Sequence, residues 1–297
     1  MRAREFFEQR NILEVDTPVL SKFPVTDPNI ECLSLNCAAG TDLFLHTSPE
    51  YKMKQLLAAG YGDIYQICKV FRDGERGPHH LREFTLVEWY RPKFGLREIM
   101  GDTIEFIASV LDRSELSASA EFASYEDVFQ RTVNLDPRSV DVEELALCVN
   151  ADQQLRNALG DDRDAWLDLV LAQSIVPELA DDRLTVIFHY PASQAALARI
   201  CPDDKNAADR FEVFYGRHEL ANGFVELTDA DEQRSRFEMD REKRRRNQAA
   251  AREIDEDLIN ALRAGMPACA GVAVGFDRLL MLHEDQDNIS AVSSFVV

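Results

Sequence analysis

Short segments rich in aromatic and β-branched residues, separated by helical patterns and turns, constrain the fold of this chain more than any other feature. Strand-like segments lie at residues 42–46, 63–71, 83–91, 184–190 and 211–227, and helical patterns lie at residues 97–111, 124–130 and 229–247. Strands that pair through hairpins, with helices outside them, build an α+β fold around a largely antiparallel sheet. We therefore expect mainly antiparallel strands flanked by helices.

The chain is expected to form one domain over residues 1–297. It contains no internal repeat, and no linker rich in Pro, Gly or Ser separates halves of different composition. Residues 1–11 read as the end of a helix that leads into an extended run at 12–19. The acidic, helix-like stretch at about 140–183 is predicted to be an insertion packed beside the sheet.

The overall charge argues against several classes of protein. Thirty-three Lys and Arg residues against 53 Asp and Glu residues give a formal net charge of −20, which disfavours attraction to nucleic acid or to an anionic membrane. No run approaches the roughly 20 apolar residues of a membrane-spanning helix, and the N-terminus lacks the apolar core of a signal peptide. These features predict a cytoplasmic protein without membrane attachment. Scattered cysteines without a C-x-x-C pair predict free thiols.

A loop at residues 72–82 lies between two strand-like segments and carries several arginines and histidines, so it could bind a polyphosphate. In the strand that follows, a period of two places these residues on one face: Phe84, Leu86, Glu88 and Tyr90. A carboxylate in line with aromatic side chains indicates a surface that faces a ligand. The alternative is an exposed hairpin loop, with a partly buried Glu88 held by a neighbour.

Two glutamates near a predicted hairpin are candidates for a metal site. If Tyr215 and Gly216 form a two-residue turn, Glu212 falls directly opposite Glu219. Like charges in these positions repel unless a cation lies between them. We therefore expect the pair to hold Mg²⁺, which binds carboxylate and phosphate oxygens. The alternative is that both side chains extend into water or pair with a neighbouring arginine.

A strand of small residues at 271–275 leads into a helix that we expect Asp277 to cap. Arg278 would lie in the first turn, where its charge opposes the helix dipole, and a bound anion would explain its presence. The alternative is an arginine that bridges to a nearby carboxylate. A second basic feature, at residues 243–246, is typical of a solvated helix face and is a minor candidate for docking an acidic macromolecule.

Three of these segments resemble the signature motifs of the class II aminoacyl-tRNA synthetases. They are the extended run that ends at Pro18, the Phe71-Arg72 strand with its loop and Glu83-Phe84, and Gly275-Phe276-Asp277-Arg278. Segments similar to the lysyl branch of that class lie at residues 47–51, 88–92, 219–224 and 226–230. More narrowly, the chain resembles the stand-alone paralogues of this branch that attach β-lysine to elongation factor P. The similarity runs nearly from end to end.

The resemblance implies a class II synthetase-like catalytic domain that acts as an ATP-dependent ligase. Such an enzyme activates lysine or (R)-β-lysine as an adenylate and transfers it to a lysine ε-amine of elongation factor P. The paralogues lack the anticodon-binding barrel of a lysyl-tRNA synthetase, and this chain leaves no room for one before the first motif. That difference and the acidic charge argue against tRNA as a partner. The first motif also implies a homodimer.

The resemblance further implies roles for individual residues. Arg72 and Arg278 would hold the α- and γ-phosphates of ATP as the catalytic pair, and Phe84 would stack on adenine. The other residues expected to contact ATP are Glu75, His80, Glu219 and Gly275, while Glu212 and Glu219 would hold Mg²⁺. Glu50 would bind the backbone amine of the amino acid and Glu226 its ε-ammonium, since a buried ammonium needs a charged partner. The other expected substrate contacts are Ser48, Glu88, Tyr90 and Asn222.

Two positions depart from the family pattern on the adenine side. The family has a glutamate two residues after the first arginine, where this chain has Gly74, and it has Asn-Pro where this chain has Leu81-Arg82. Loss of one or two hydrogen bonds would weaken ATP binding by about 1–3 kcal/mol, roughly tenfold to a hundredfold, unless Glu75 substitutes. Two alternatives stay open: a silent regulatory binding protein and a truncated lysine-activating enzyme of the lysyl-tRNA synthetase type. Glu226 and Asn222 argue against a third, an ammonia-dependent asparagine-forming ligase.

Overall fold

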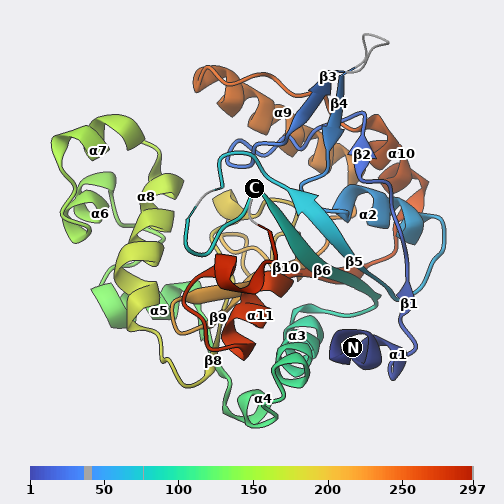
Figure 1. Ribbon diagram of the computed structural model, residues 1–297. Helices are drawn as coiled ribbons and strands as arrows, with labels where there is room; N and C mark the ends of the chain where they lie inside the picture. Colours follow the sequence, from blue (N-terminus) through green and yellow to red (C-terminus); the bar gives the residue numbers. More distant parts are fainter. Residues whose placement is uncertain (37–41, 76, 296–297) are drawn as a thin grey trace.

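An eight-stranded sheet runs through the computed structural model, which describes residues 1–36, 42–75 and 77–295 (Figure 1). In spatial order its strands are β1 (Leu13–Glu14), β5 (Ile64–Phe71), β6 (Glu83–Pro92), β11 (Cys269–Gly275), β10 (His218–Val225), β9 (Arg210–Tyr215), β8 (Leu184–Phe188) and β7 (Glu121–Ser124). The pairings from β5 through to β8 are antiparallel, and the edge strands β1 and β7 pair in parallel. The expected α+β fold with a mainly antiparallel sheet is confirmed. A smaller antiparallel sheet contains β2 (Leu20–Ser21), β4 (Asp42–Leu45) and β3 (Ser34–Asn36).

Helices cover both faces of the large sheet. The α-helices of the described residues are α1 (Arg2–Glu8), α2 (Glu50–Ala58), α3 (Leu96–Leu111), α4 (Glu115–Ser119), α5 (Tyr125–Val133), α6 (Val142–Cys148), α7 (Gln153–Leu159), α8 (Arg163–Val170), α9 (Ala230–Arg246), α10 (Glu256–Gly265) and α11 (Phe276–His283). Single π-helical or 3₁₀ turns lie at η1 (Leu171–Ile175), η2 (Val176–Glu178), η3 (Ala192–Gln194) and η4 (Ile289–Val292). Among the described residues, no helix is long and apolar enough to cross a membrane.

The sequence-based expectations omit α2, α4 and α10. A signal for α10 is present, because the Asp255 side chain accepts a hydrogen bond from the Leu258 N–H at 3.0 Å, and apolar residues follow at helical spacing. Helix α2 is harder to recognise because it begins directly after Pro49 and carries two lysines. One of these lysines, Lys54, is buried.

Alternate residues of each strand point to opposite faces of the sheet, and the two faces differ in role. One face packs against α1, α3 and α11 in a hydrophobic cluster that includes Val87 and Trp89 of β6. In this cluster Phe7 of α1 stacks on Tyr65 of β5 with ring centroids 4.0 Å apart. Glu88 and Tyr90 therefore point to the opposite face, as the period of two predicts. That opposite face carries the candidate site.

Helices α6, α7 and α8 lie together at one side of the molecule (Figure 1), and Lys243 of α9 contacts Asp162, the N-cap residue of α8, at 2.8 Å. The three helices occupy much of the acidic stretch at 140–183. Trp166 and Leu167 of α8 are buried in a second hydrophobic cluster with Ile187 of β8 and Phe214 of β9. These helices thus pack against the end of the sheet through their own core.

The hairpin of β9 and β10 corrects one expectation. Its turn begins at Gly216, one residue later than predicted, and this glycine has the positive φ of +52° that such a turn needs. A bulge in β10 then shifts the register, so that Glu212 faces Asn222. Glu212 and Glu219 are therefore not directly opposite each other.

The basic end of α9 is not a uniform exposed surface. Arg244 is completely buried, whereas the side chains of Arg245 and Arg246 are 54% and 75% exposed. The Arg244 guanidinium donates to the carbonyl oxygen of Asp27 at 2.7 Å and pairs with Glu31. The first arginine of this run is thus structural, which weakens the idea of a basic docking patch.

Candidate active site

A cavity of about 260 Å³ opens on the face of the sheet that α3 does not cover, and residues from both predicted phosphate motifs line it. The predicted ATP residues among its lining are Arg72, Glu75, His80, Phe84, Glu219, Gly275 and Arg278, and Asn222 lines it as well. Segments that are far apart in the sequence therefore meet at one site. Arg72 and Arg278 both line this cavity, as a binding site for one nucleotide requires.

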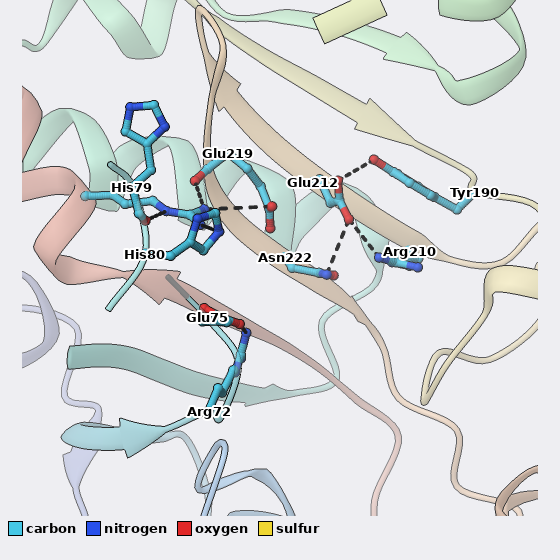
Figure 2. Close-up of polar contacts among 10 residues, drawn as sticks. Arg72, Glu75, His79, His80, Tyr190, Arg210, Glu212, Glu219 and Asn222 are labelled. Atoms are coloured by element: carbon cyan, nitrogen blue, oxygen red, sulfur yellow. Dashed lines mark hydrogen bonds and ion pairs between the residues drawn. The ribbon is translucent and has the colours of Figure 1, made fainter. Parts of the chain in front are cut away.

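Arg72 directly follows β5, and Figure 2 shows its side chain directed toward Glu75. Its Nε donates to the carbonyl oxygen of Thr47 at 3.3 Å, and its Nη1 lies 3.4 Å from Oε1 of Glu75. The Arg72 Cζ lies 5.1 Å from the centre of the Phe84 ring, within the range of a cation–π contact. This corner of the cavity can therefore bind an anion and a flat aromatic group side by side.

Arg278 lies in the first turn of α11 and is held by three contacts. Its Nη1 donates to the carbonyl oxygen of Glu219 at 2.6 Å, and its Nε donates to that of His79 at 3.3 Å. Its Nη2 lies 2.9 Å from Nε2 of His80. Burial and the charge of Arg278 lower the pKa of His80, which favours a neutral imidazole that accepts from the guanidinium.

Asp277 does not cap α11, contrary to the expectation. The helix begins earlier, with Gly275 as its N-cap residue, so Asp277 lies inside the first turn. The Asp277 carboxylate instead accepts a hydrogen bond from the backbone N–H of Thr85 on β6 at 2.6 Å. This bond ties the start of α11 to β6 beside the cavity.

The two predicted metal ligands differ in their surroundings (Figure 2). The Glu219 carboxylate is 42% exposed and lies 3.8 Å from Nη1 of Arg278. The Glu212 carboxylate is buried and has three hydrogen-bond donors around it. These donors are Tyr190 at 2.7 Å, Arg210 at 2.7 Å and Asn222 at 3.4 Å. Glu219 is thus open to the cavity, whereas Glu212 is held behind it.

Electrostatics favour a cation near this pair of carboxylates. Burial raises the pKa of Glu212 to about 7, and the negative charge of Glu219 adds to the effect despite the Arg210 guanidinium. A divalent cation would favour the ionised form of both acids, and Mg²⁺ prefers carboxylate oxygens. The charge of the pair therefore fits Mg²⁺, although Glu212 and Glu219 are not cross-strand neighbours.

Beyond the cavity lined by Arg72 and Arg278, the same face of the sheet carries a cluster of acidic side chains, Glu50, Glu88 and Glu226, which we call the acidic pocket; Glu88 and Glu226 are buried. Glu88 is 2% exposed, and its carboxylate accepts hydrogen bonds from the hydroxyl groups of Ser48 at 2.8 Å and Tyr90 at 2.7 Å. Burial and the charge of Glu50 raise the pKa of Glu88 to about 7. A buried acid with a raised pKa suits a cationic ligand, which would stabilise its charged form.

An ammonium group of the protein itself lies in this pocket, and sequence reasoning missed it. The Lys54 side chain is 1% exposed, and its Nζ lies 2.6 Å from Oε1 of Glu50 and 2.6 Å from Oε2 of Glu226. The carboxylate expected to bind the substrate's ε-ammonium thus already has a cation beside it. A lysine four residues after a glutamate normally reads as an exposed helical pair, so the sequence signal was misleading.

Asn222 lies at the nucleotide cavity rather than beside Glu226. The strand register aligns it with Ala273 of β11 and Glu88 of β6 in one row across the sheet. Glu226 lies four residues further along the chain, about 13 Å at the spacing of an extended strand. The Oδ1 atom of Asn222 is buried without a hydrogen-bond partner among the described residues. Asn222 therefore lies between the Glu212–Glu219 pair and the acidic pocket.

One cluster with metal-ligand chemistry lies away from this site. The ligand atoms of His189, Cys201 and Asp209 are within 4.8 Å of one another. The Asp209 carboxylate already accepts a hydrogen bond from Nε of Arg199 at 2.7 Å. A metal ion would have to compete with this guanidinium for the carboxylate.

Replacement of Gly271 by alanine is expected to disturb the acidic pocket. A Cβ at Gly271 would lie 2.4 Å from Cε1 of Tyr90 and 2.6 Å from Oε1 of Glu226, so both buried side chains would have to move. We expect a loss of roughly 1–3 kcal/mol in the free energy of unfolding and weaker binding of a cationic ligand beside these side chains. Thermal denaturation and titration calorimetry measure the two effects. The matched control is Gly101→Ala in α3, where a Cβ meets nothing within 4 Å and alanine should stabilise the helix by about 0.5–1 kcal/mol.

The acidic pocket should make the free protein less stable as the pH rises. The pKa of Glu88 is raised to about 7 and that of Glu226 to about 8, chiefly by burial, whereas an unfolded Glu has a pKa of about 4.3. Between these values the folded state binds more protons, so the free energy of unfolding falls as pH rises through that range. We expect Glu88→Gln to flatten the fall in melting temperature between about pH 5.5 and pH 8.

Glu256→Gln serves as the control for this pH dependence. A hydrogen bond from Arg234 lowers the pKa of Glu256, so this group titrates below the tested range. Its replacement should leave the slope of melting temperature against pH unchanged between about pH 5.5 and pH 8. An unaltered slope in Glu88→Gln would contradict the assignment of Glu88 as a proton-binding group.

A sheet that brings two arginines to one cavity, beside a buried acidic pocket, agrees with the fold and motifs of the class II synthetases. The family model for "tRNA synthetases class II (D, K and N)" matches residues 1–297. The chain belongs to this family.

Curated relatives indicate which enzymes within this family the chain is similar to. The elongation factor P (R)-β-lysine ligase of Haemophilus influenzae (strain Rd) is 44% identical over 301 residues, which cover 100% of this chain and 92% of that protein. The ligase of the same name from Sodalis glossinidius is 45% identical over 300 residues, with 99% and 91% covered. The one from Klebsiella pneumoniae is 43% identical over 301 residues, again with 99% and 91% covered. The resemblance inferred from the motifs is therefore confirmed.

Proposed function

We propose that this chain is an ATP-dependent ligase that activates lysine or (R)-β-lysine as an adenylate and transfers it to a lysine ε-amine of elongation factor P. The observation that carries the proposal is the continuity of two sites on one face of the sheet. A cavity lined by Arg72 and Arg278 is followed, on the same face of the sheet, by a cluster of acids that includes the buried Glu88 and Glu226. The names of the curated relatives support the choice of acceptor and amino acid.

The cavity supports ATP as the nucleotide substrate. In the proposed enzyme Arg72 contacts the α-phosphate and Arg278 the γ-phosphate, with Gly275 and His80 beside them. Phe84 offers a flat surface for adenine next to the Arg72 guanidinium. Glu75 lines the same cavity one residue after Gly74, so it is the proposed substitute for the missing family glutamate.

The proposed chemistry has two steps. The amino-acid carboxylate attacks the α-phosphorus, the bond to the β-phosphate oxygen breaks, and pyrophosphate leaves. A neutral ε-amine of the acceptor then attacks the activated carbonyl, the bond to AMP breaks, and the amine loses a proton as the amide forms. Arg72 stabilises the charge on the α-phosphate oxygens, while Ser48, Glu50 and Tyr90 position the amino acid.

Glu219 and Glu212 are the residues proposed to hold Mg²⁺. When bound there, the ion would neutralise negative charge on the phosphates of the substrate. Glu219 would contribute an accessible carboxylate, and Glu212 would contribute through a carboxylate that Arg210 and Tyr190 already orient.

Mass spectrometry of purified elongation factor P tests the function. We expect a mass gain equal to one lysine residue that requires this protein, ATP and either lysine or (R)-β-lysine. Exchange of labelled pyrophosphate into ATP separates the alternatives. A silent binding protein would show neither exchange nor mass gain, and a lysine-activating enzyme of the lysyl-tRNA synthetase type would show exchange without mass gain. Either result would overturn the proposal.

We also propose a cytoplasmic homodimer that does not use tRNA. Leu13 of the edge strand β1 and Leu20 of β2 are 53% and 47% exposed, which supports an apolar contact with a second copy. The net charge of −20 opposes binding to a phosphate backbone. Sedimentation at micromolar concentration should find a dimer, and a monomer there would contradict it.

A further inference from the structure

The acidic pocket contains a cation that belongs to the protein. Lys54 extends from α2 between Glu50, on the same helix, and Glu226, which follows β10. Its Nζ also lies 5.5 Å from the centre of the Phe224 ring. Both carboxylates are 2.6 Å from this ammonium, and the Glu226 side chain has no exposed surface. Lys54 is therefore enclosed, rather than a surface lysine that happens to meet an acid.

The pocket contains more carboxyl groups than cations of the protein. Lys54 is the ammonium among three carboxyl groups, and burial and the charge of Glu50 raise the pKa of both Glu88 and Glu226. Burial lowers the pKa of Lys54, but Glu226 and Glu50 outweigh burial and the net shift is upward, so the lysine stays charged. In the free protein the pKa of Glu88 is raised to about 7 and that of Glu226 to about 8, and a further cation beside them would favour the ionised form of both acids. Lysine and β-lysine each bring two ammonium groups.

Other titratable groups near Lys54 do not change this balance. The Tyr90 hydroxyl and the Cys269 thiol both feel the charge of Glu226, and burial raises the pKa of each. Both groups are therefore neutral at ordinary pH. On the outer side of α2, Lys52 pairs with Asp255, the N-cap residue of α10, at 3.7 Å. These two charges compensate each other.

We propose that Lys54 is a positioning and specificity-determining residue: its ammonium bridges Glu50 and Glu226 and fixes both carboxylates, so that the pocket accepts an amino acid with two ammonium groups. This inference rests on the proposed function and adds a residue to it. Lys54 does not touch the reacting atoms. It acts through the two carboxylates that it orients.

The pH dependence of substrate affinity distinguishes this role from simple support of the fold. Without Lys54, the buried acids would bind protons more tightly, because a nearby positive charge is lost. The carboxylates must be ionised to bind ammonium groups, so affinity would improve only at higher pH. Replacement of a residue that merely supports the fold would change the affinity for the amino acid. It would not change the pH at which that affinity becomes constant.

The experiment uses Lys54→Met, Lys54→Ala and the matched control Lys52→Met in pyrophosphate exchange with lysine and β-lysine. In Lys54→Met we expect the KM for the amino acid to rise by about 10–100-fold near pH 7, with a smaller change in kcat. Its KM should then fall toward higher pH beyond the point where the wild-type KM levels off. Lys52→Met should behave as the wild type.

Chemical rescue provides the second variant, which also serves if Lys54→Met folds poorly. Lys54→Ala removes a group of the size of propylammonium. Added propylammonium should lower the KM of Lys54→Ala, whereas 1-propanol, of the same length without charge, should not. The same amine should have no effect on Lys54→Met, where the space is filled.

The outcomes separate the two levels of inference. If the wild type exchanges pyrophosphate with lysine or β-lysine, and Lys54→Met keeps its KM and its pH profile, the role of Lys54 is overturned while the proposed function stands. Rescue of Lys54→Ala by propanol as well as by propylammonium would also overturn it, because space and not charge would then matter. If the wild type shows no exchange with either isomer, the proposed function falls, and the role of Lys54 falls with it.

Discussion

Replacement of Arg72 by alanine is expected to lower the rate constant for amino-acid activation by about 10²–10³-fold, the size of effect seen when one preorganised donor to a developing charge is removed. Arg72 is held by the Thr47 carbonyl oxygen and by Glu75, and it lines the nucleotide cavity. In the proposed complex with ATP, its loss would remove the cation that we assign to the α-phosphate. Pyrophosphate exchange at saturating ATP and lysine measures the effect.

Arg82 provides a matched control on the same loop. Its side chain is 39% exposed and lies 3.4 Å from Asp73, and it is not part of the cavity lining among the described residues. We expect Arg82→Ala to retain activity within about twofold, as for a surface ion pair. Arg72→Lys should fall between the wild type and Arg72→Ala, because an ammonium keeps the charge without the planar fork. Activity of Arg72→Ala close to that of Arg82→Ala would contradict the catalytic role.

Replacement of Arg244 by alanine is expected to cause the largest loss of stability. The buried guanidinium joins α9 to two other segments: it donates to the carbonyl oxygens of Asp27 at 2.7 Å and Ala250 at 3.0 Å, and it pairs with Glu31. Its removal leaves these acceptors without their donor. We expect the free energy of unfolding to fall by roughly 3 kcal/mol, the low end of the range for a broken buried pair, because Glu31 is itself 43% exposed. Chemical denaturation measures this change.

The neighbouring arginine is the control for this prediction. Arg246 lies two residues further along α9, is 75% exposed and pairs with Glu242 within the helix. Its replacement by alanine should change stability by no more than about 0.5 kcal/mol. Equal losses for the two variants would show that the contacts of Arg244 with the segment at 27–31 do not stabilise the fold.

The strand periodicity of the sequence was enough to predict much of the fold. Because side chains alternate across a strand, the pattern at 83–91 was enough to separate Val87 and Trp89 of the core from Glu88 and Tyr90 of the site. The motifs around Arg72 and Arg278 were recognisable by residue type and order. Their meeting at one cavity followed from the family resemblance and not from any spacing in the chain.

Register and helix starts could not be derived in the same way. The turn that begins one residue late and the bulge in β10 together move Glu212 from opposite Glu219 to opposite Asn222, and no residue pattern indicates either. The start of α11 depends on whether the Asp277 carboxylate bonds to its own helix or to the Thr85 N–H of another strand. Small differences in local free energy decide the strand register and the helix start. Contacts with residues that are distant in the sequence determine which alternative forms.

Residue type and periodicity, which are local properties, thus established the class of fold, the two faces of β6 and the inventory of candidate residues. The electrostatic state of the pocket was decided in three dimensions. Lys54 has the sequence signature of a solvated helical cation, yet the packing of α2 against the sheet encloses it between Glu50 and a carboxylate 172 positions further along the chain, Glu226. Charge interactions depend on distance in space and on burial, and neither quantity is written in the order of the residues.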